Sequence, residues 1–180
     1  HLSIRRQRQM CIRDRINERV IVPFYANGKL VGYTARIIKN YENVPKYYSV
    51  VQPGYIYNFD HLYNDRKYLI IAEGVLDALA IDSVSSLGNK LTQGQIELIN
   101  STDKTVIVCP DRDKSGGNLI DVAVENNWLV SFPQWEENIK DCAEAVNKYG
   151  RLYTVQSVIN GAIGNIAKIK VLKTIGATNA

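Results

Sequence analysis

Two aspartates stand one residue apart directly after an apolar run of the sequence. The run VIVCP at residues 106–110 leads into Asp111 and Asp113, and Ser115, Gly116 and Gly117 follow at once. Side chains at positions i and i+2 of a strand point the same way, so we expect both carboxylates to project together from the end of a strand. Like charges held this close repel each other, and a neighbouring positive charge must offset that repulsion.

A third acidic residue, Glu73, follows a second apolar run, KYLIIA at residues 67–72. Continuously apolar strands are typical of parallel sheets covered on both faces, and functional residues gather at the carboxyl ends of such strands. Carboxylate oxygens at one sheet edge suit a hard divalent cation, for which Mg²⁺ is the usual choice in nucleotide chemistry. We therefore expect Glu73, Asp111 and Asp113 to form a metal site. The alternative is that Asp111 or Asp113 only caps the following helix.

Asp77 lies four residues after Glu73, on the same face of the helix that is expected to start near residue 75. The dipole at a helix N-terminus favours a negative charge in any case. A purely structural role for Asp77 and a role beside the metal ligands therefore both remain open.

The elements that position these acids alternate between strand and helix patterns from residue 67 onward. We expect strands at 67–72, 84–88, 104–109 and 128–133. Helices are predicted from residue 75, at 92–100, 113–127, 141–149 and 152–169, and Thr92 and Gln95 have the spacing of a capping box. This alternation predicts an α/β fold with a mainly parallel sheet and flanking helices.

The chain before residue 67 has a different character. Asn27-Gly28 separates two β-rich runs and is a strong hairpin signal, because both residues accept positive φ. Residues 39–66 are rich in Tyr, Asn and Pro and indicate a long loop with short extended pieces. We expect a small hairpin-containing lobe at 16–66, the sheet domain at 67–150 and a C-terminal helical segment at 151–180.

Composition narrows the functional classes. The 180 residues are 46% hydrophobic, and neither a membrane-spanning run nor a signal peptide is recognisable, so we expect a cytoplasmic protein without membrane contact. Cys11, Cys109 and Cys142 lack C-x-x-C spacing and are expected to be reduced, structural thiols. His1 and His61 form no ligand pair in the sequence, and packing is the preferred interpretation of His61.

The first 15 residues carry the whole net charge of +4, with five arginines and one aspartate. The remainder has equal numbers of acidic and basic side chains, so overall charge argues neither for nor against a polyanionic partner. The portion RQMCIRDR resembles translated sequencing-adapter read-through, and we exclude residues 1–15 from fold reasoning. The alternative is a genuine basic arm.

The motifs also carry a family resemblance. AEGVLDALA at 72–80 and PDRDKSG at 110–116 resemble the TOPRIM signature shared by topoisomerases and primases. The hairpin segment with PKYYS at 45–49 is similar to the region before TOPRIM in DnaG-type primases, including small phage primases. SSLGNKLTQGQ at 85–95 resembles the stretch after the first TOPRIM helix.

The resemblance implies roles for particular residues. Glu73, Asp111 and Asp113 match the family's catalytic metal-binding acids, and Asp141 in KDCAEA matches a further metal-binding acid. Arg36 and Lys46 fall on the family's basic positions for nucleotide or template contact. The implied cofactor is Mg²⁺ or Mn²⁺, which would hold a triphosphate and stabilise the charge that develops during in-line attack.

The function that this resemblance implies is that of a DNA primase catalytic core, phage-like in type. It would synthesise short RNA primers from NTPs on a single-stranded DNA template, in the cytoplasm of a bacterial or phage-infected cell, with a replicative helicase as partner. The alternatives are a TOPRIM nuclease or topoisomerase component that cuts phosphodiester bonds, and a non-catalytic nucleotide-binding module.

The chain departs from the family pattern in three respects. Ala143 stands where a second acid is usual, with Glu144 one place further, and this puts a complete second metal site in doubt. Arg112 and Pro110 frame the acid pair where small or apolar residues are more usual. The zinc-binding module and helicase-binding region of a whole primase are missing, so we expect a fragment that begins inside the polymerase core.

Overall fold

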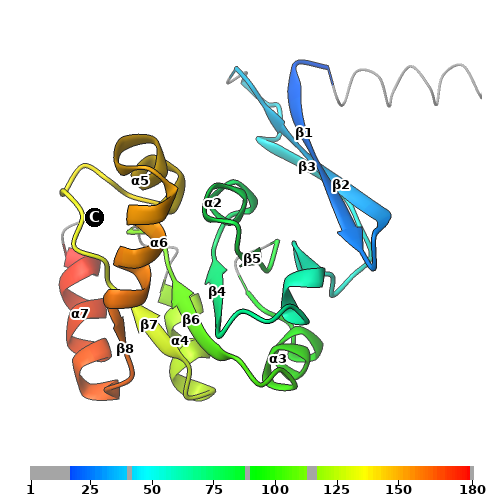
Figure 1. Cartoon of the computed structure of the whole chain (residues 1–180). Coiled ribbons are helices and arrows are strands. Elements are labelled where there is room, and N and C mark those ends of the chain that lie inside the picture. The colour runs from blue at the N-terminus through cyan, green and yellow to red at the C-terminus, as the bar shows by residue number, and fades with distance from the viewer. Residues whose placement is uncertain (1–16, 40–41, 88–89, 113–116, 179–180) are drawn as a thin grey trace, which may run out of the picture. The chain divides into compact units, whose positions relative to one another are not determined.

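The computed structural model describes residues 17–39, 42–87, 90–112 and 117–178 (Figure 1). Two expectations from the sequence, the doubtful segment 1–15 and the role of Asp113, lie outside the described residues. The chain divides into two compact units, residues 1–53 and 54–180, which are described separately below.

The N-terminal unit contains an antiparallel sheet in the order β1-β2-β3. Its strands are β1 (Arg19–Ala26), β2 (Lys29–Ile37) and β3 (Tyr47–Val50). Asn27 and Gly28 connect the first two strands with φ values of 51° and 70°, so the predicted hairpin is confirmed. Phe24 and Ala35 are completely buried, and the opposite face of β1 exposes Ile21 and Tyr25.

The C-terminal unit contains a five-stranded sheet in the order β5-β4-β6-β7-β8. The strands are β4 (Tyr68–Ala72), β5 (Val84–Ser85), β6 (Thr105–Cys109), β7 (Leu129–Ser131) and β8 (Ala162–Ile163). All neighbouring strands are parallel except β7 and β8, which pair antiparallel. The predicted α/β fold with a mainly parallel sheet is therefore confirmed.

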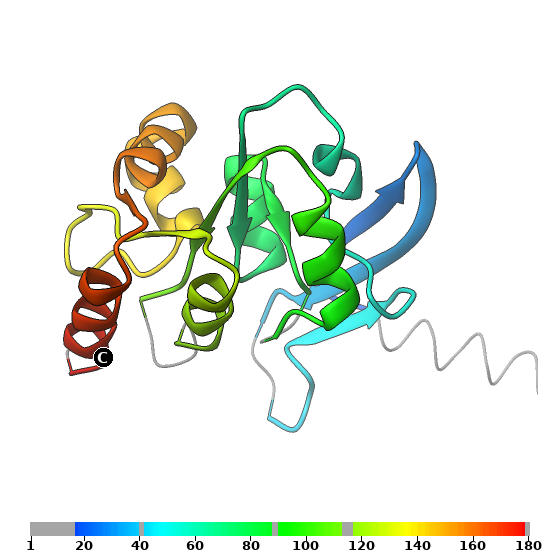
Figure 2. The same cartoon turned by 90° about the horizontal axis from the view of Figure 1, so that it is seen from below.

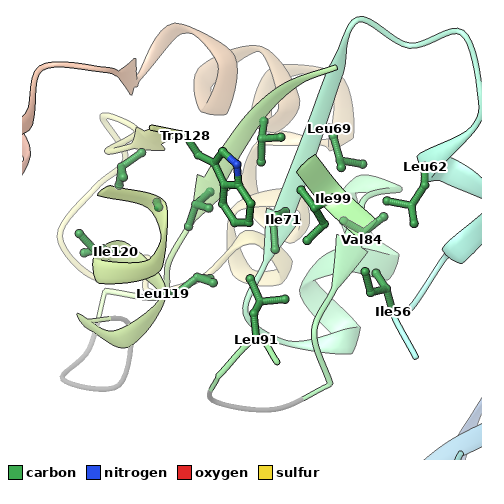
Figure 3. Packing of buried hydrophobic residues seen from close by; sticks show 14 of the residues in the cluster. Ile56, Leu62, Leu69, Ile71, Val84, Leu91, Ile99, Leu119, Ile120 and Trp128 are labelled. Carbon is green, nitrogen blue, oxygen red and sulfur yellow. The ribbon is translucent and has the colours of Figure 1, made fainter. Parts of the chain in front are cut away.

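Helices cover both faces of this sheet (Figure 2). They are α2 (Val75–Ile81), α3 (Gln93–Asn100), α4 (Gly117–Glu125), α5 (Cys142–Tyr149), α6 (Arg151–Asn160) and α7 (Ile166–Thr178). Alternate residues of the strands point to opposite faces. Leu69 and Ile71 pack with α3, α4 and α7 (Figure 3), whereas Ile70 and Ile107 pack with α2, α5 and α6. Within the described ranges, no helix is long and apolar enough to cross a membrane.

The C-terminal segment differs from the single helix predicted at 152–169. The chain leaves α6 at Gly161, adds the short strand β8 to the sheet, and begins α7 at Ile166. A Cβ atom at Gly161 would lie 3.0 Å from backbone atoms of Phe132 and Pro133. This close passage beside the end of β7 requires a residue without a side chain, and apolar periodicity does not reveal it.

Residues 54–66, which the sequence predicts to lie in the hairpin-containing lobe, cluster with the C-terminal unit that begins at Gly54. The segment contains the 3₁₀ helix η1 (Phe59–Leu62). Ile56 and Leu62 are buried in the core under α3, and the Tyr57 N–H donates a hydrogen bond of 2.9 Å to the Ser85 carbonyl. Burial of these apolar side chains holds the segment against the sheet.

Candidate functional site

Glu73 and Asp111 meet at the carboxyl ends of two neighbouring parallel strands. β4 and β6 pair through Ala72 and Cys109, and Glu73 follows the first strand while Asp111 comes two residues after the second. The Asp111 N–H donates a hydrogen bond of 3.4 Å to Oε2 of Glu73. The parallel register thus brings together two of the acids that the sequence places at strand ends.

A second pair of carboxylates, Asp77 and Asp141, lies where α2 and α5 pack together. Asp77 sits in the first turn of α2 and is buried. Its Oδ1 atom accepts a hydrogen bond of 2.9 Å from the Ala143 N–H. Burial raises the pKa of Asp77 to about 6, and the charge of Asp141 and a hydrogen bond with it act in the same direction.

Asp141 occupies the N-cap position of α5. Its Oδ1 atom accepts a hydrogen bond of 2.7 Å from the Glu144 N–H. The Glu144 carboxylate in turn accepts a bond of 2.8 Å from the Lys140 N–H. Glu144, which stands one position after the site where the family pattern has its second acid, therefore takes part in the cap of α5. Ala143, which occupies that site, donates its backbone N–H to Asp77.

Gly74 makes room for the Asp77 carboxylate. A Cβ atom at Gly74 would lie 2.5 Å from Oδ2 of Asp77, which is too close for any real contact. The φ value of Gly74 is −97°, an angle that every residue type adopts, so space rather than backbone conformation requires glycine here.

Cys109 and Cys142 lie behind the carboxylates as a buried pair of free thiols. Their sulfur atoms are 3.5 Å apart. The hydrogen bond with Cys109, burial, and the charges of Asp77 and Asp111 all raise the pKa of the Cys142 thiol. Both residues are therefore buried, free thiols of the core, in agreement with the expectation of structural cysteines.

The acids supply oxygen donors of the kind that divalent cations take. Four carboxylates lie in two pairs, Glu73 with Asp111 and Asp77 with Asp141, and oxygen donors suit Mg²⁺. Within residues 17–39, 42–87, 90–112 and 117–178, no three His, Cys, Asp or Glu side chains are close enough together to hold an ion. The donor types fit a hard cation, which would also reduce the repulsion between Asp77 and Asp141.

Arg36 and Lys46 lie in the N-terminal unit and contact the same aromatic ring. The Arg36 guanidinium is 5.6 Å, and the Lys46 ammonium 5.8 Å, from the ring centre of Tyr47. Arg36 and Tyr47 face each other across the β2–β3 pairing. The unit thus presents two cations around one partly exposed tyrosine, an arrangement that suits phosphate and base contact.

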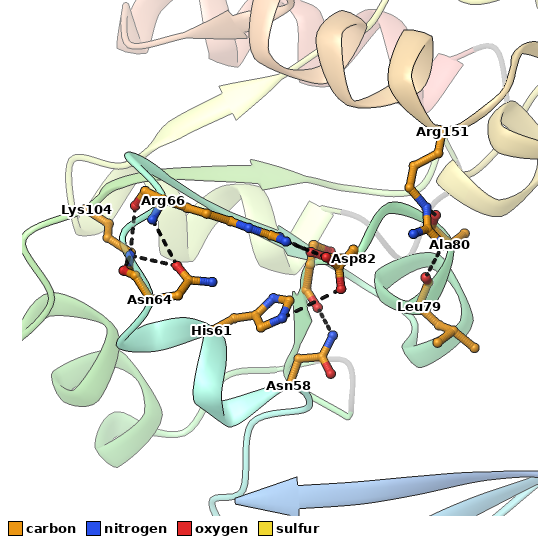
Figure 4. A network of polar contacts seen from close by, with 10 residues as sticks. Asn58, His61, Asn64, Arg66, Leu79, Ala80, Asp82, Lys104 and Arg151 are labelled. Carbon is orange, nitrogen blue, oxygen red and sulfur yellow. Dashed lines mark hydrogen bonds and ion pairs between the residues drawn. The ribbon is translucent and has the colours of Figure 1, made fainter. Parts of the chain in front are cut away.

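A cavity of about 580 Å³ lies near the start of β4, at the end of this strand remote from Glu73. Its walls are mainly apolar, and Arg66, Asp82 and Arg151 also line it. Figure 4 shows the polar contacts that these three residues make. His61 lies 3.6 Å from Asp82, and burial lowers the pKa of His61. None of the four carboxylates that lie at the carboxyl ends of β4 and β6 or between α2 and α5 lines this cavity.

Residues 70–146 match the protein family described as Toprim-like. This segment includes most of β4, all of β6 and α2, and the start of α5, and it contains all four described carboxylates. The C-terminal unit therefore contains a Toprim-like domain.

Known DNA primases are similar to a larger part of the chain. The DNA primase of Mycoplasma genitalium is 29% identical over 143 residues, which are 69% of this chain and 24% of that protein. A structure of the Aquifex aeolicus primase with its zinc-binding and RNA polymerase domains matches with a TM-score of 0.67 and 21% identity, over 85% of this chain and 42% of that chain. A structure of the DnaG primase catalytic domain bound to ssDNA matches with a TM-score of 0.63 and 22% identity, over 87% and 59%.

The chain is thus similar to DNA primases beyond the Toprim-like segment itself. Its fold is similar to that of the solved DNA primase catalytic domains. The chain spans about a quarter of the length of the Mycoplasma protein, 24%.

Proposed function

We propose that this chain is the catalytic core of a DNA primase, a nucleotidyltransferase that makes short RNA primers on single-stranded DNA from NTPs. The observation that carries the proposal is the meeting of Glu73 and Asp111 at the carboxyl ends of β4 and β6, inside a Toprim-like domain related to DNA primases. The structure of a DnaG primase catalytic domain bound to ssDNA supports single-stranded DNA as the template.

The proposal assigns the carboxylates to a divalent cation, Mg²⁺ or Mn²⁺. Glu73, Asp111, Asp113 and Asp141 would hold it, as the resemblance to the primase family implies. A bound cation would screen the triphosphate and stabilise the charge that develops during in-line attack. Asp77 would keep Asp141 in place through the shared α2–α5 contact, and its buried carboxylate would lose its proton more readily beside a cation.

Arg36 and Lys46 would contact phosphate groups of the template or the nucleotide. A guanidinium binds phosphate in a bidentate manner, whereas an ammonium acts as a point charge. Tyr47, whose ring both cations approach, would add an aromatic group for contact with a base. The proposal further includes a replicative helicase as partner, and the cytoplasm of a bacterial or phage-infected cell as the location.

The test is Mg²⁺-dependent incorporation of labelled NTPs on a mixed single-stranded DNA template. We expect RNA products from the wild-type chain and none from Asp111→Ala or Asp113→Ala. Asp103→Asn, which removes an exposed carboxylate, serves as the matched control and should keep activity.

If the template is cut instead of copied, the nuclease alternative replaces this proposal. If a zinc-binding module supplied in trans also yields no RNA, the chain is a binding module.

A further inference from the structure

Arg112, the residue between the two sequence-predicted aspartates, reaches away from them and contacts an irregular connection. Its guanidinium donates hydrogen bonds to the carbonyl oxygens of Pro133, Trp135, Glu136 and Ile139. Its backbone N–H donates to the Lys140 carbonyl at 2.9 Å. One residue of the Asp111 loop thus binds five carbonyl groups of a segment more than 20 positions away.

The contacted segment, residues 132–140, runs from β7 to the N-cap of α5 and has neither helix nor strand structure. Such a connection has no repeating hydrogen bonds of its own, so its position depends on outside contacts. The Trp135 ring lies 5.5 Å from the Arg112 guanidinium, and its Nε1 donates a bond of 2.7 Å to Ser157 on α6. Ile139, buried near the end of the segment, also limits its movement.

Asp141 follows this segment directly, so the location of the segment sets the location of that carboxylate. The Arg112 contact with Lys140 lies one residue before Asp141 and one residue after Asp111. Burial lowers the pKa of Arg112, yet a guanidinium stays charged at every physiological pH. The contacts of this guanidinium with the segment before Asp141 therefore keep their charged donor at neutral pH.

We propose that Arg112 is a positioning residue for the metal site: it holds segment 132–140 so that Asp141 stays beside Asp77 and within reach of the Asp111 loop. This role rests on the proposed function, because it assigns the carboxylates to a divalent cation. A planar guanidinium suits the task, since it spreads five N–H donors over several carbonyl groups. An ammonium group is a point charge and can satisfy only part of them.

The test measures Mn²⁺ binding to the wild type, Arg112→Lys and Arg112→Ala. The electron paramagnetic resonance signal of the free ion reports how much Mn²⁺ remains unbound. We expect about tenfold weaker Mn²⁺ binding for Arg112→Ala, in the range found when the groups that orient metal ligands are removed. Arg112→Lys should recover part of the affinity. Hydrogen exchange of residues 132–140 should become faster in the same order.

Arg151 provides the matched control, because it also binds backbone carbonyl groups with its guanidinium. Its Nε atom donates a bond of 2.7 Å to Ala80 (Figure 4), and Arg151 lines the remote cavity. Arg151→Ala should lower the melting temperature but leave Mn²⁺ affinity unchanged. Equal Mn²⁺ affinities for wild type, Arg112→Lys and Arg112→Ala would overturn the proposal. If Arg112→Ala does not fold, the comparison of Arg112→Lys with wild type decides.

The two proposals fail in different ways. A wild-type chain that binds Mn²⁺ but makes no RNA contradicts the primase function, while the affinities of the Arg112 variants still decide the positioning role. A wild-type chain that makes RNA, with unchanged Mn²⁺ affinity in the Arg112 variants, contradicts only the positioning role.

Discussion

The Oδ1 atom of Asp77 accepts a hydrogen bond of 2.9 Å from the backbone N–H of Ala143, which lies 66 positions further along the chain. This bond joins the first turn of α2 to the first turn of α5. It also holds a buried carboxylate next to that of Asp141. The two helices that contribute these acids are therefore fixed to each other at the point where the charges repel.

Asp77→Asn should stabilise the metal-free protein at neutral pH. An amide oxygen can still accept the Ala143 N–H, but the cost of burying a charge disappears. The pKa of Asp77 is raised from 3.8 to about 6 in the folded state, so the folded state binds this proton more tightly. The contribution of this tighter proton binding to the free energy of unfolding is fully present below about pH 4 and is lost as the pH rises through 6.

We expect the free energy of unfolding of Asp77→Asn at pH 7 to exceed that of wild type by about 1–2 kcal/mol. Urea unfolding in EDTA between pH 4 and 8 measures this difference. Asp103→Asn, with its exposed side chain, should follow the wild-type curve. An Asp77→Asn curve parallel to that of wild type would contradict the raised pKa.

Glu73→Gln should separate the charge of this residue from its structural contact. The amide oxygen can still accept the Asp111 N–H, so the melting temperature should change little. RNA synthesis should fall by at least about 100-fold, because loss of a metal ligand exceeds the effect of losing its supporting groups. Primer synthesis over a range of Mg²⁺ concentrations measures the loss. Activity near the wild-type level would remove Glu73 from the site.

Substitutions of Asp141 should distinguish the stability that its helix cap provides from the effect of its negative charge. Asp141→Ala removes the hydrogen bond to the Glu144 N–H and should cost about 1 kcal/mol of stability. Asp141→Ser keeps a capping oxygen and removes the repulsion with Asp77, so its stability should equal or exceed that of wild type. Both variants should bind Mn²⁺ more weakly. If Asp141→Ser retained full Mn²⁺ affinity, Asp141 would be only a helix cap.

The thiols of Cys109 and Cys142 should react slowly in the folded protein. Both are 2% exposed, and the raised pKa of Cys142 keeps its thiol protonated at neutral pH. We expect alkylation by iodoacetamide at pH 7 to be at least about 100-fold slower than in concentrated urea. A Cys11→Ser background removes the third cysteine from the measurement. Equal rates in the two conditions would show that the pair is accessible.

The cations around Tyr47 should contribute salt-dependent binding of single-stranded DNA. If Arg36 and Lys46 each contact a phosphate, the double substitution to alanine should reduce the slope of log K against log salt by about 1.4. Fluorescence anisotropy with a labelled oligonucleotide measures this slope. Lys29→Ala together with Lys39→Ala, in exposed positions of the same unit, is the charge-matched control. An unchanged slope for Arg36→Ala/Lys46→Ala would exclude these two residues from the template contact.

Much of the fold could be predicted because its signals are local. The turn at Asn27-Gly28 follows from residue type, and the capping box of α3 is present, with Gln95 accepting the Thr92 N–H at 2.8 Å. Periodicity alone indicated the buried strands. The interruption of the last helix depends on how closely Gly161 passes Phe132, and no local pattern encodes that contact.

In the candidate site, too, the features set by local sequence could be predicted, whereas the contacts between distant segments could not. The position of Glu73 and Asp111 at strand ends could be predicted from the apolar runs that precede them. The contact between Asp77 and Ala143 and the carbonyl contacts of Arg112 join segments far apart in sequence. The charge of Arg112 was visible in the sequence, but nothing there indicated that it binds segment 132–140.

The strands at the two edges of the larger sheet, β5 and β8, are only two residues long. Tyr57 also bridges to Ser85 and covers part of the β5 edge. Within the described residues, another chain therefore finds few backbone groups to which it could add a strand. This geometry protects the hydrophobic central strands from edge-to-edge aggregation, the usual hazard of an open parallel sheet at high protein concentration.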